Sequence, residues 1–158
     1  MTFRTAALAA LAALTLAGCN YQSFPDPSLS GKDKEYMALV PRFDIDREYL
    51  RYRVDDPTGE PAGTIVVDTA SRKLYLVHPG GEAIQYGIGV GRLGFAWKGS
   101  ATIGRKAEWP SWTPPTAMLK RRPDLPTFME GGLDNPLGAR ALYLYDGGRD
   151  TLFRIHGT

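Results

Sequence analysis

Two residue types in this chain have the chemistry for nucleophilic catalysis: a histidine near the end and a cysteine near the start. His156 closes a run of apolar and β-branched residues, so the imidazole is expected at the end of a strand. An imidazole in that position can take a proton from a thiol and return it to a leaving group. Cys19 is the only cysteine in the 158 residues.

The residues that precede Cys19 predict that its thiol is modified by a lipid and is not a nucleophile. Arg4 precedes an uncharged run at residues 6–16, which has secretory length and is too short to span a bilayer. Small residues then lead to Cys19, as in the bacterial lipobox. We expect residues 1–18 to be a lipoprotein signal peptide and Cys19 to carry the lipid. The alternatives are a plain signal peptide with an incidental cysteine, or a buried apolar helix.

Lipidation of Cys19 predicts a protein of the bacterial cell envelope that faces the periplasm. Acyl chains would hold it on the membrane, because stable anchoring takes more than one chain. Asn20 follows the cysteine in place of an aspartate, which favours the outer over the inner membrane. An acylated Cys19 leaves no free thiol in the chain, and a single cysteine can form neither an internal disulfide nor a cysteine metal site.

Composition narrows the class of protein further. The formal charge is +2 with no basic cluster, so nucleic acid is not an expected partner. Eighteen glycines and twelve prolines favour a turn-rich, mainly β architecture over a helical bundle. No group of His, Asp and Glu has metal-ligand spacing, and no cofactor is predicted.

We expect the chain to divide into a signal peptide over residues 1–18, a tether over residues 19–44 and one domain over residues 45–158. Residues 46–54 predict a short helix or an extended arm. Three strands with short turns, forming an antiparallel meander, are expected at residues 63–68, 73–77 and 82–91. Alternating glycines from residue 86 on predict a close approach of another backbone.

The second half of the domain is expected to be irregular at first and then to form a hairpin. Residues 92–138 predict little regular structure apart from a short helix at 116–122. The hairpin joins residues 141–145 to 151–156. In its last strand, Leu152, Arg154 and His156 share one face, while Phe153 and Ile155 are expected to be buried on the other.

Three tryptophans lie in the irregular stretch, at positions 97, 109 and 112. They fit two roles equally from their residue type: lining a peptide groove, or anchoring a long loop by packing. Arg140 and Arg154 are candidates for contacting the carboxylates of a peptide substrate, because a guanidinium can bind a carboxylate through two parallel hydrogen bonds.

Five segments in one order resemble the L,D-transpeptidase catalytic domain, the YkuD family. They are residues 63–68 (GTIVVD), 86–91 (YGIGVG), 109–115 (WPSWTPP), 134–144 (DNPLGARALYL) and 154–158 (RIHGT). The resemblance covers residues 45–158. It implies a mainly β, sandwich-like domain with few short helices, incomplete at its C-terminal end. It also implies action on peptidoglycan stem peptides.

The resemblance further assigns roles to residues. His156 matches the general base, and the carbonyl of Gly157 matches the group that fixes the imidazole tautomer. The family's nucleophile is a cysteine in a Ser-x-Gly-Cys segment that follows the histidine, and its thioester intermediate leads to a 3→3 cross-link. Some members instead attach a lipoprotein or hydrolyse the bond. That segment is absent here, so we expect the 158 residues alone to catalyse nothing.

Three functional hypotheses therefore stand. The first is a lipid-anchored L,D-transpeptidase, with stem peptides as partners and an open oligomeric state. The second is a non-catalytic, peptidoglycan-binding lipoprotein that keeps the fold of the enzyme. The third is an unrelated β-rich lipoprotein. Codons for a Ser-x-Gly-Cys segment shortly after position 158 would favour the first, and a stop codon there the second.

Overall fold

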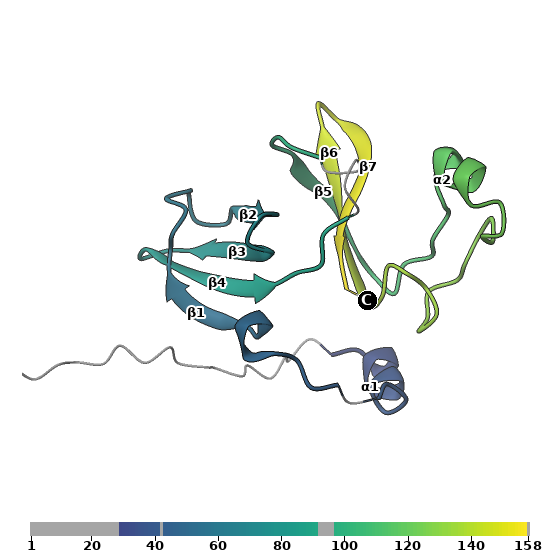
Figure 1. Cartoon of the computed structure of the whole chain (residues 1–158), viewed down its shortest axis with the longest axis horizontal. Helices are drawn as coiled ribbons and strands as arrows, with labels where there is room; N and C mark the ends of the chain where they lie inside the picture. Colours follow the sequence, from purple (N-terminus) through teal and green to yellow (C-terminus); the bar gives the residue numbers. More distant parts are fainter. Residues whose placement is uncertain (1–28, 42, 92–96, 158) are drawn as a thin grey trace, which may run out of the picture. The chain divides into compact units, whose positions relative to one another are not determined.

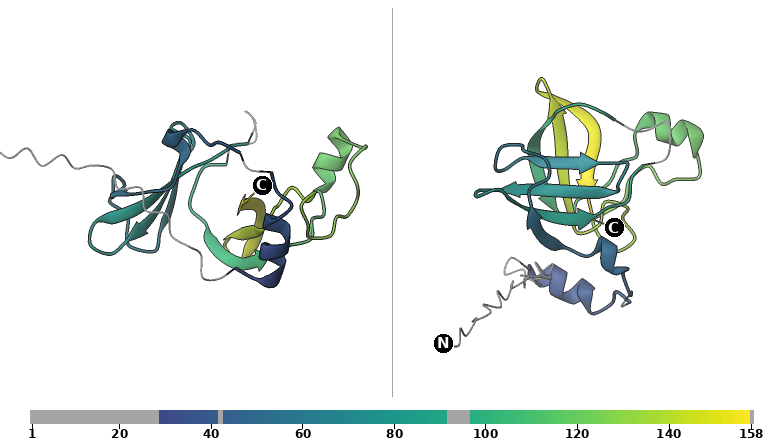
Figure 2. Two further views of the ribbon diagram at one scale, coloured as in Figure 1. Left: turned by 90° about the horizontal axis from the view of Figure 1, so that it is seen from below. Right: turned by 60° about the vertical axis from the view of Figure 1, so that its left-hand side comes forward.

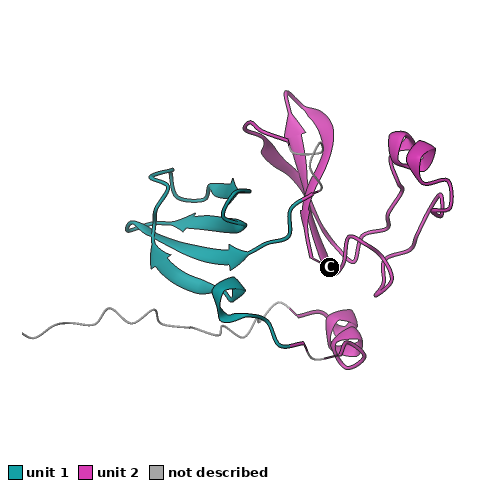
Figure 3. Ribbon diagram, viewed as in Figure 1, with its two compact units in different colours: residues 1–25, 44–90 teal, residues 26–43, 91–158 magenta. Residues whose placement is uncertain are grey.

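Short strands joined by turns and loops make up the two sheets of the described residues. The computed structural model describes residues 29–41, 43–91 and 97–157. The predicted signal peptide and Cys19 lie outside the described residues. The described part forms seven strands, two short α-helices and one 3-10 helix, which confirms the mainly β prediction (Figure 1). The chain divides into unit 1, with residues 1–25 and 44–90, of which residues 44–90 are described, and unit 2, with residues 26–43 and 91–158 (Figure 3).

Unit 1 is a four-stranded antiparallel sheet. Its strands are β1 (Tyr52–Asp55), β2 (Ile65–Asp68), β3 (Lys73–His78) and β4 (Glu82–Gly87), in the order β1-β4-β3-β2. The predicted meander of three strands is therefore confirmed, although β4 ends at Gly87 and not at residue 91. For residues 46–54 the sequence predicted a short helix or an extended arm. The structure has a short 3-10 helix, η1 (Arg47–Tyr49), followed by the extended strand β1.

Local contacts explain why unit 1 folds where its sequence predicts. The Asp68 carboxylate closes the β2–β3 turn by accepting hydrogen bonds from the backbone N–H of Ala70 and Ser71. The buried side chains Leu74, Val77, Ala83 and Ile84 come from the two central strands. Gly87 permits the predicted close approach, since an added Cβ would lie 2.5 Å from the Cβ of Tyr49.

Unit 2 contains a three-stranded antiparallel sheet in the order β5-β6-β7. Its strands are β5 (Thr102–Glu108), β6 (Arg140–Asp146) and β7 (Arg149–His156), and its helices are α1 (Gly31–Met37) and α2 (Thr116–Arg121). The β6–β7 hairpin and helix α2 confirm the predictions. Gly147 and Gly148, with φ of 52° and 79°, form the two-residue hairpin turn that favours positive φ at both positions.

Three features of unit 2 correct the expectations from sequence. Strand β5 lies in the stretch predicted to be irregular. Almost all of its residues are exposed, and its sequence, TIGRKAE, does not show the alternation of apolar and polar residues that predicts a strand. Phe153 is 38% exposed and not buried. The expected alternation along β7 is broken because Leu152 has a φ of 63° and the β6–β7 register shifts between Tyr143 and Tyr145.

A further difference concerns the segment expected to be a tether. Residues 31–37 form helix α1, which starts at a capping box in which Ser30 and Asp33 each bond the other's backbone N–H. The spacing Ser30-x-x-Asp33 in the sequence is typical of the first turn of a helix. Helix α1 belongs to unit 2, and Figure 2 shows it as the dark blue coil. At least this part of the expected tether is folded.

Candidate active site

The predicted base lies at the last residue of β7. Ala141 of β6 is the register partner of His156, and the imidazole is exposed. Its Nδ1 lies 3.2 Å from the carbonyl oxygen of Gly157. A carbonyl only accepts hydrogen bonds, so the contact is a hydrogen bond when Nδ1 carries the proton, and the neutral ring then has its lone pair on Nε2. In that tautomer, Nε2 is the atom that can take a proton.

The backbone of β6 fixes the next residue. The N–H of Gly157 donates to the carbonyl of Arg140 at 3.1 Å. The peptide unit that follows His156 is therefore tied to the first residue of β6. The predicted residues His156, Gly157 and Arg140 are brought together at this end of the sheet, where β5 and β7 end and β6 begins.

The Arg140 side chain, predicted to meet substrate carboxylates, is paired with a carboxylate of the protein. Its Nη1 and Nη2 donate to the two oxygens of Asp33 at 2.9 and 2.6 Å. Asp33 is 3% exposed, whereas the Arg140 side chain is 36% exposed. The Arg140 guanidinium holds the pKa of Asp33 well below its ordinary value, against the opposing effect of burial.

Asp33 also reaches the residue that follows β5. The indole Nε1 of Trp109 donates to Asp33 Oδ1 at 2.7 Å, and the ring of Tyr36 meets that of Trp109 edge-on with centroids 4.5 Å apart. The ammonium of Lys32 donates to the carbonyl of Gly131 at 3.0 Å. These contacts show Trp109 in a packing role, one of the two predicted for it, and they dock helix α1 onto the rest of unit 2.

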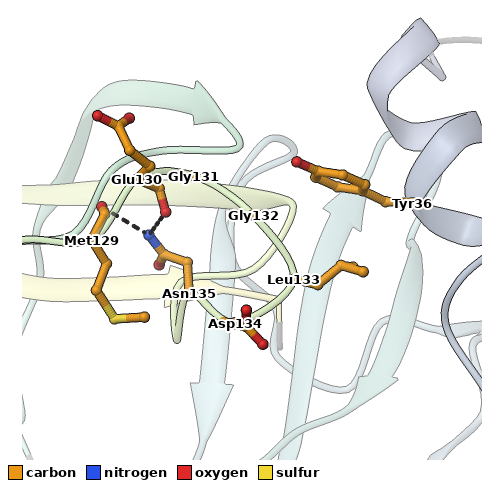
Figure 4. Close-up of a pocket in the computed structure, with 8 residues that line it drawn as sticks. All are labelled: Tyr36, Met129, Glu130, Gly131, Gly132, Leu133, Asp134 and Asn135. Carbon is orange, nitrogen blue, oxygen red and sulfur yellow. Dashed lines mark hydrogen bonds between the residues drawn. The ribbon is translucent and has the colours of Figure 1, made fainter.

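A loop beside α1 borders an open depression of about 460 Å³ (Figure 4). The buried amide of Asn135 organises this loop: its Nδ2 donates to the carbonyls of Pro110 and Glu130 at 3.0 Å each, and its Oδ1 accepts from the N–H of Leu137. The lining residues are Tyr36 and residues 129–135. Asn135 is the most buried of them, so its role is to shape the loop.

Arg154, the other candidate for substrate carboxylates, also has partners within the protein. Its two Nη atoms donate to the carboxylate of Asp150 at 2.7 and 2.8 Å, and its guanidinium lies 4.2 Å from the ring centre of Tyr143. Arg105 stacks on that ring as well, at 3.9 Å. The Arg154 guanidinium lowers the pKa of Asp150. Contact of Arg140 and Arg154 with a substrate stays a prediction.

Two features of the described residues bear on metals and membranes. Within residues 29–41, 43–91 and 97–157, no three His, Cys, Asp or Glu side chains are grouped to hold a metal ion. None of the helices in this part of the chain has the length and apolar character needed to cross a bilayer.

Sequence reasoning missed Asp33 and Asn135, the two buried polar residues in the described part of unit 2. Asn135 lies inside a segment that the resemblance singled out, but its type and spacing did not mark it as buried. The capping-box spacing at Ser30 and Asp33 could have revealed helix α1. Nothing in the sequence pattern pairs Asp33 with Arg140, because 107 positions separate them.

Comparison with known protein families agrees with this geometry. Residues 62–158 match the family model of the L,D-transpeptidase catalytic domain, YkuD. The match covers more than half of the chain and includes β5, β6, β7, His156 and Gly157. The chain therefore belongs to the L,D-transpeptidase catalytic domain family.

Individual relatives share this family name. The chain is similar to the probable L,D-transpeptidase ErfK/SrfK of Escherichia coli, with 38% identity over 101 residues, 60% of this chain and 31% of the relative. The putative L,D-transpeptidase of the ATP synthase region of Fuscovulum blasticum is 38% identical over 105 residues, 65% of this chain and 52% of the relative. The chain thus spans about a third to a half of these curated relatives.

A solved structure is similar over more of its length. It is a crystal structure described as a probable carnitine operon oxidoreductase CaiA from Brucella melitensis. The sequence identity is 43% and the TM-score is 0.61, with 77% of this chain and 73% of that one covered. The oxidoreductase description is that of the Brucella melitensis protein.

Proposed function

We propose that this protein is a peptidoglycan L,D-transpeptidase in which His156 is the general base. The supporting observation is the 3.2 Å contact between His156 Nδ1 and the Gly157 carbonyl, which leaves Nε2 available as the proton acceptor. Family membership supports the same reaction class, and the exposed imidazole is open to a thiol and a substrate.

The proposed reaction is an acyl transfer in two steps. Nε2 of His156 takes the thiol proton, and the thiolate sulfur bonds to the carbonyl carbon of the third stem residue. The C–N bond to the terminal D-alanine then breaks, and the imidazolium returns the proton to the departing amine. In the second step the side-chain amine of another stem attacks the thioester carbon and Nε2 of His156 takes its proton. The C–S bond then breaks, the proton returns to the departing sulfur, and the new C–N bond is the 3→3 cross-link.

The thiol of this reaction is the component that the 158 residues do not provide. Their only cysteine is Cys19, which we propose is lipidated after removal of residues 1–18. We therefore expect no covalent adduct when these residues alone are treated with a carbapenem and weighed by intact mass spectrometry. An adduct within residues 45–158 would contradict this expectation.

The decisive experiment uses the gene. We expect codons beyond position 158 to encode a Ser-x-Gly-Cys segment, and the longer protein to gain the mass of one carbapenem. Changing His156→Ala should abolish that adduct, whereas His78→Ala, at the exposed end of β3, should leave it intact. A longer protein without a reactive cysteine that still binds muropeptides would support the non-catalytic alternative.

The proposed location is the bacterial envelope, with the domain facing the periplasm and the lipid on Cys19 in the outer membrane. Labelling of cells with a clickable palmitate analogue tests this. We expect label on the protein and none on the Cys19→Ser variant, with fractionation to the outer membrane. Equal labelling of both proteins would contradict lipidation at Cys19.

A further inference from the structure

Helix α1 contacts the end of the unit 2 sheet at which the candidate base lies. Asp33 binds the side chain of Trp109, directly after β5, and that of Arg140, the first residue of β6. The backbone of Arg140 in turn holds Gly157, directly after β7. The buried carboxylate of Asp33 therefore links the end of β5 to the start of β6. The end of β7 is linked to the start of β6 through the bond between Gly157 and Arg140.

The contacts form a continuous series from Asp33 to the imidazole. The carboxylate accepts two hydrogen bonds from the Arg140 guanidinium, at 2.6 and 2.9 Å. The Arg140 carbonyl accepts from Gly157 N–H at 3.1 Å, and the Gly157 carbonyl lies 3.2 Å from His156 Nδ1. We propose that Asp33 is a positioning residue that, through Arg140 and Gly157, holds His156 in the tautomer with a free Nε2.

The geometry explains why Asp33 has this effect and a surface acid would not. Both of its oxygens receive donors: Oδ1 from Trp109 and Arg140, and Oδ2 from Arg140 and the backbone N–H of Ser30. A two-bond, charge-assisted pair fixes the plane of the guanidinium, which a single surface contact does not. With Arg140 so fixed, the strand start that carries its carbonyl has little freedom to move away from Gly157.

The positioning role of Asp33 rests on the proposed function only because that function makes His156 the base. An experiment that tests the positioning role needs neither the nucleophile nor a substrate. Long-range ¹H–¹⁵N NMR spectra of the full chain in detergent micelles report the tautomer of each histidine. Amide exchange reports the hydrogen bond of Gly157. His78, in unit 1, is the internal reference.

In the Asp33→Asn variant we expect the Nδ1–H form of His156 to lose population and the Gly157 amide to exchange about tenfold faster, as for a locally opened hydrogen bond. The His78 signals and the exchange of Leu142, in the interior of β6, should stay as in the native chain. General destabilisation would instead accelerate exchange throughout the β6–β7 hairpin. Glu35→Gln, an exposed acid of the same helix, is the matched control and should change neither signal.

The Arg140→Lys variant keeps the positive charge but cannot form the two-bond pair, so it should reproduce the Asp33→Asn result. It also covers the case in which Asp33→Asn does not fold. Unchanged Gly157 exchange and an unchanged His156 tautomer in a folded variant would overturn the proposal. A native chain whose His156 lacks the Nδ1–H form would instead count against His156 as the base, whereas the Gly157 exchange would still test the positioning role of Asp33.

Discussion

The two sheets of this protein are built from different kinds of buried group. In unit 1, the side chains that are less than a tenth exposed are apolar and come from the adjacent strands β3 and β4. In unit 2, buried apolar residues such as Ala141 and Tyr143 are joined by two buried polar residues. Asp33 bonds Arg140, 107 positions away, and Asn135 bonds Pro110, 25 positions away, besides partners nearby in the sequence. The candidate base lies in unit 2.

The difference shows how each sheet is stabilised. Apolar burial is non-directional, so hairpins with alternating apolar residues can form unit 1 from contacts close in sequence. Buried polar groups in unit 2 must find partners with the right geometry, or their burial costs free energy. That requirement also fixes atoms in place, which suits the part of the chain that carries the candidate base.

The largest expected effect is in unit 2, from Asn135→Ala. The change leaves the carbonyls of Pro110 and Glu130 and the backbone N–H of Leu137 without the amide, and two of these three bonds are buried, so we expect a loss of about 3–4 kcal/mol in the free energy of unfolding. Urea denaturation followed by Trp fluorescence measures it. The neighbouring exposed residue is the control, and Asp134→Ala should change stability by less than about 0.5 kcal/mol. Equal losses for both would show that the buried amide does not organise the loop.

A somewhat smaller loss is expected from the apolar core of unit 1. Leu74 is 7% exposed, and Leu74→Ala should cost about 2–3 kcal/mol through lost burial and the cavity left behind. Val67→Ala, at a residue that is 43% exposed, should cost less than about 1 kcal/mol. Hydrogen exchange with peptide resolution should place the Leu74 effect first in residues 44–90. A loss that appears first in unit 2 would contradict the comparison.

The third prediction compares two carboxylates: Asp33, which pairs with a residue far away in the sequence, and Asp68, which bonds residues of its own turn. The pKa of Asp33 is held below its ordinary value of 3.8, chiefly by Arg140. The ionised Asp33 therefore stabilises the fold at pH values above 3.8. As the pH falls below 3.8, the unfolded chain binds a proton at this carboxylate more readily than the folded chain does, so the stabilisation is lost. The urea midpoint should fall more between pH 6 and pH 3 for the native chain than for Asp33→Asn.

Asp68→Asn is the matched variant in unit 1. The pKa of Asp68 is also lowered, chiefly by the Ser71 side chain three positions away in the same exposed turn. Because water screens such a turn, this substitution should remove less of the pH dependence than Asp33→Asn does. Equal slopes for the two variants would erase the distinction between local and long-range polar contacts.

The smallest expected effect comes from a surface ion pair of unit 1. Arg53 on β1 and Glu82 on β4 lie 2.8 Å apart, with both side chains nearly half exposed. Glu82→Gln should lower stability by less than about 0.5–1 kcal/mol, and 0.5 M NaCl should reduce the difference further. A loss as large as that of Leu74→Ala would mean that unit 1 also depends on charged contacts.

The sequence predicted the parts of the fold that depend on neighbouring residues. The hairpin of β6 and β7 follows from two apolar runs around Gly147 and Gly148, and the β2–β3 turn follows from Asp68. Strand β5 was missed because its exposed residues show no apolar alternation. Phe153 was expected to be buried, and the irregularity at Leu152 could not be seen in a simple period of two.

For the candidate site, the sequence by itself determined which residues are candidates for the chemistry: it predicts His156 with Gly157 beside it as the base, and Cys19 as a site of lipidation. It did so because residue type and local order are enough to match a family motif. Only the tertiary structure decided that Arg140 is held by Asp33 and that Gly157 is tied to β6. Such partners depend on where distant segments meet in space, and neither period nor composition encodes that meeting point.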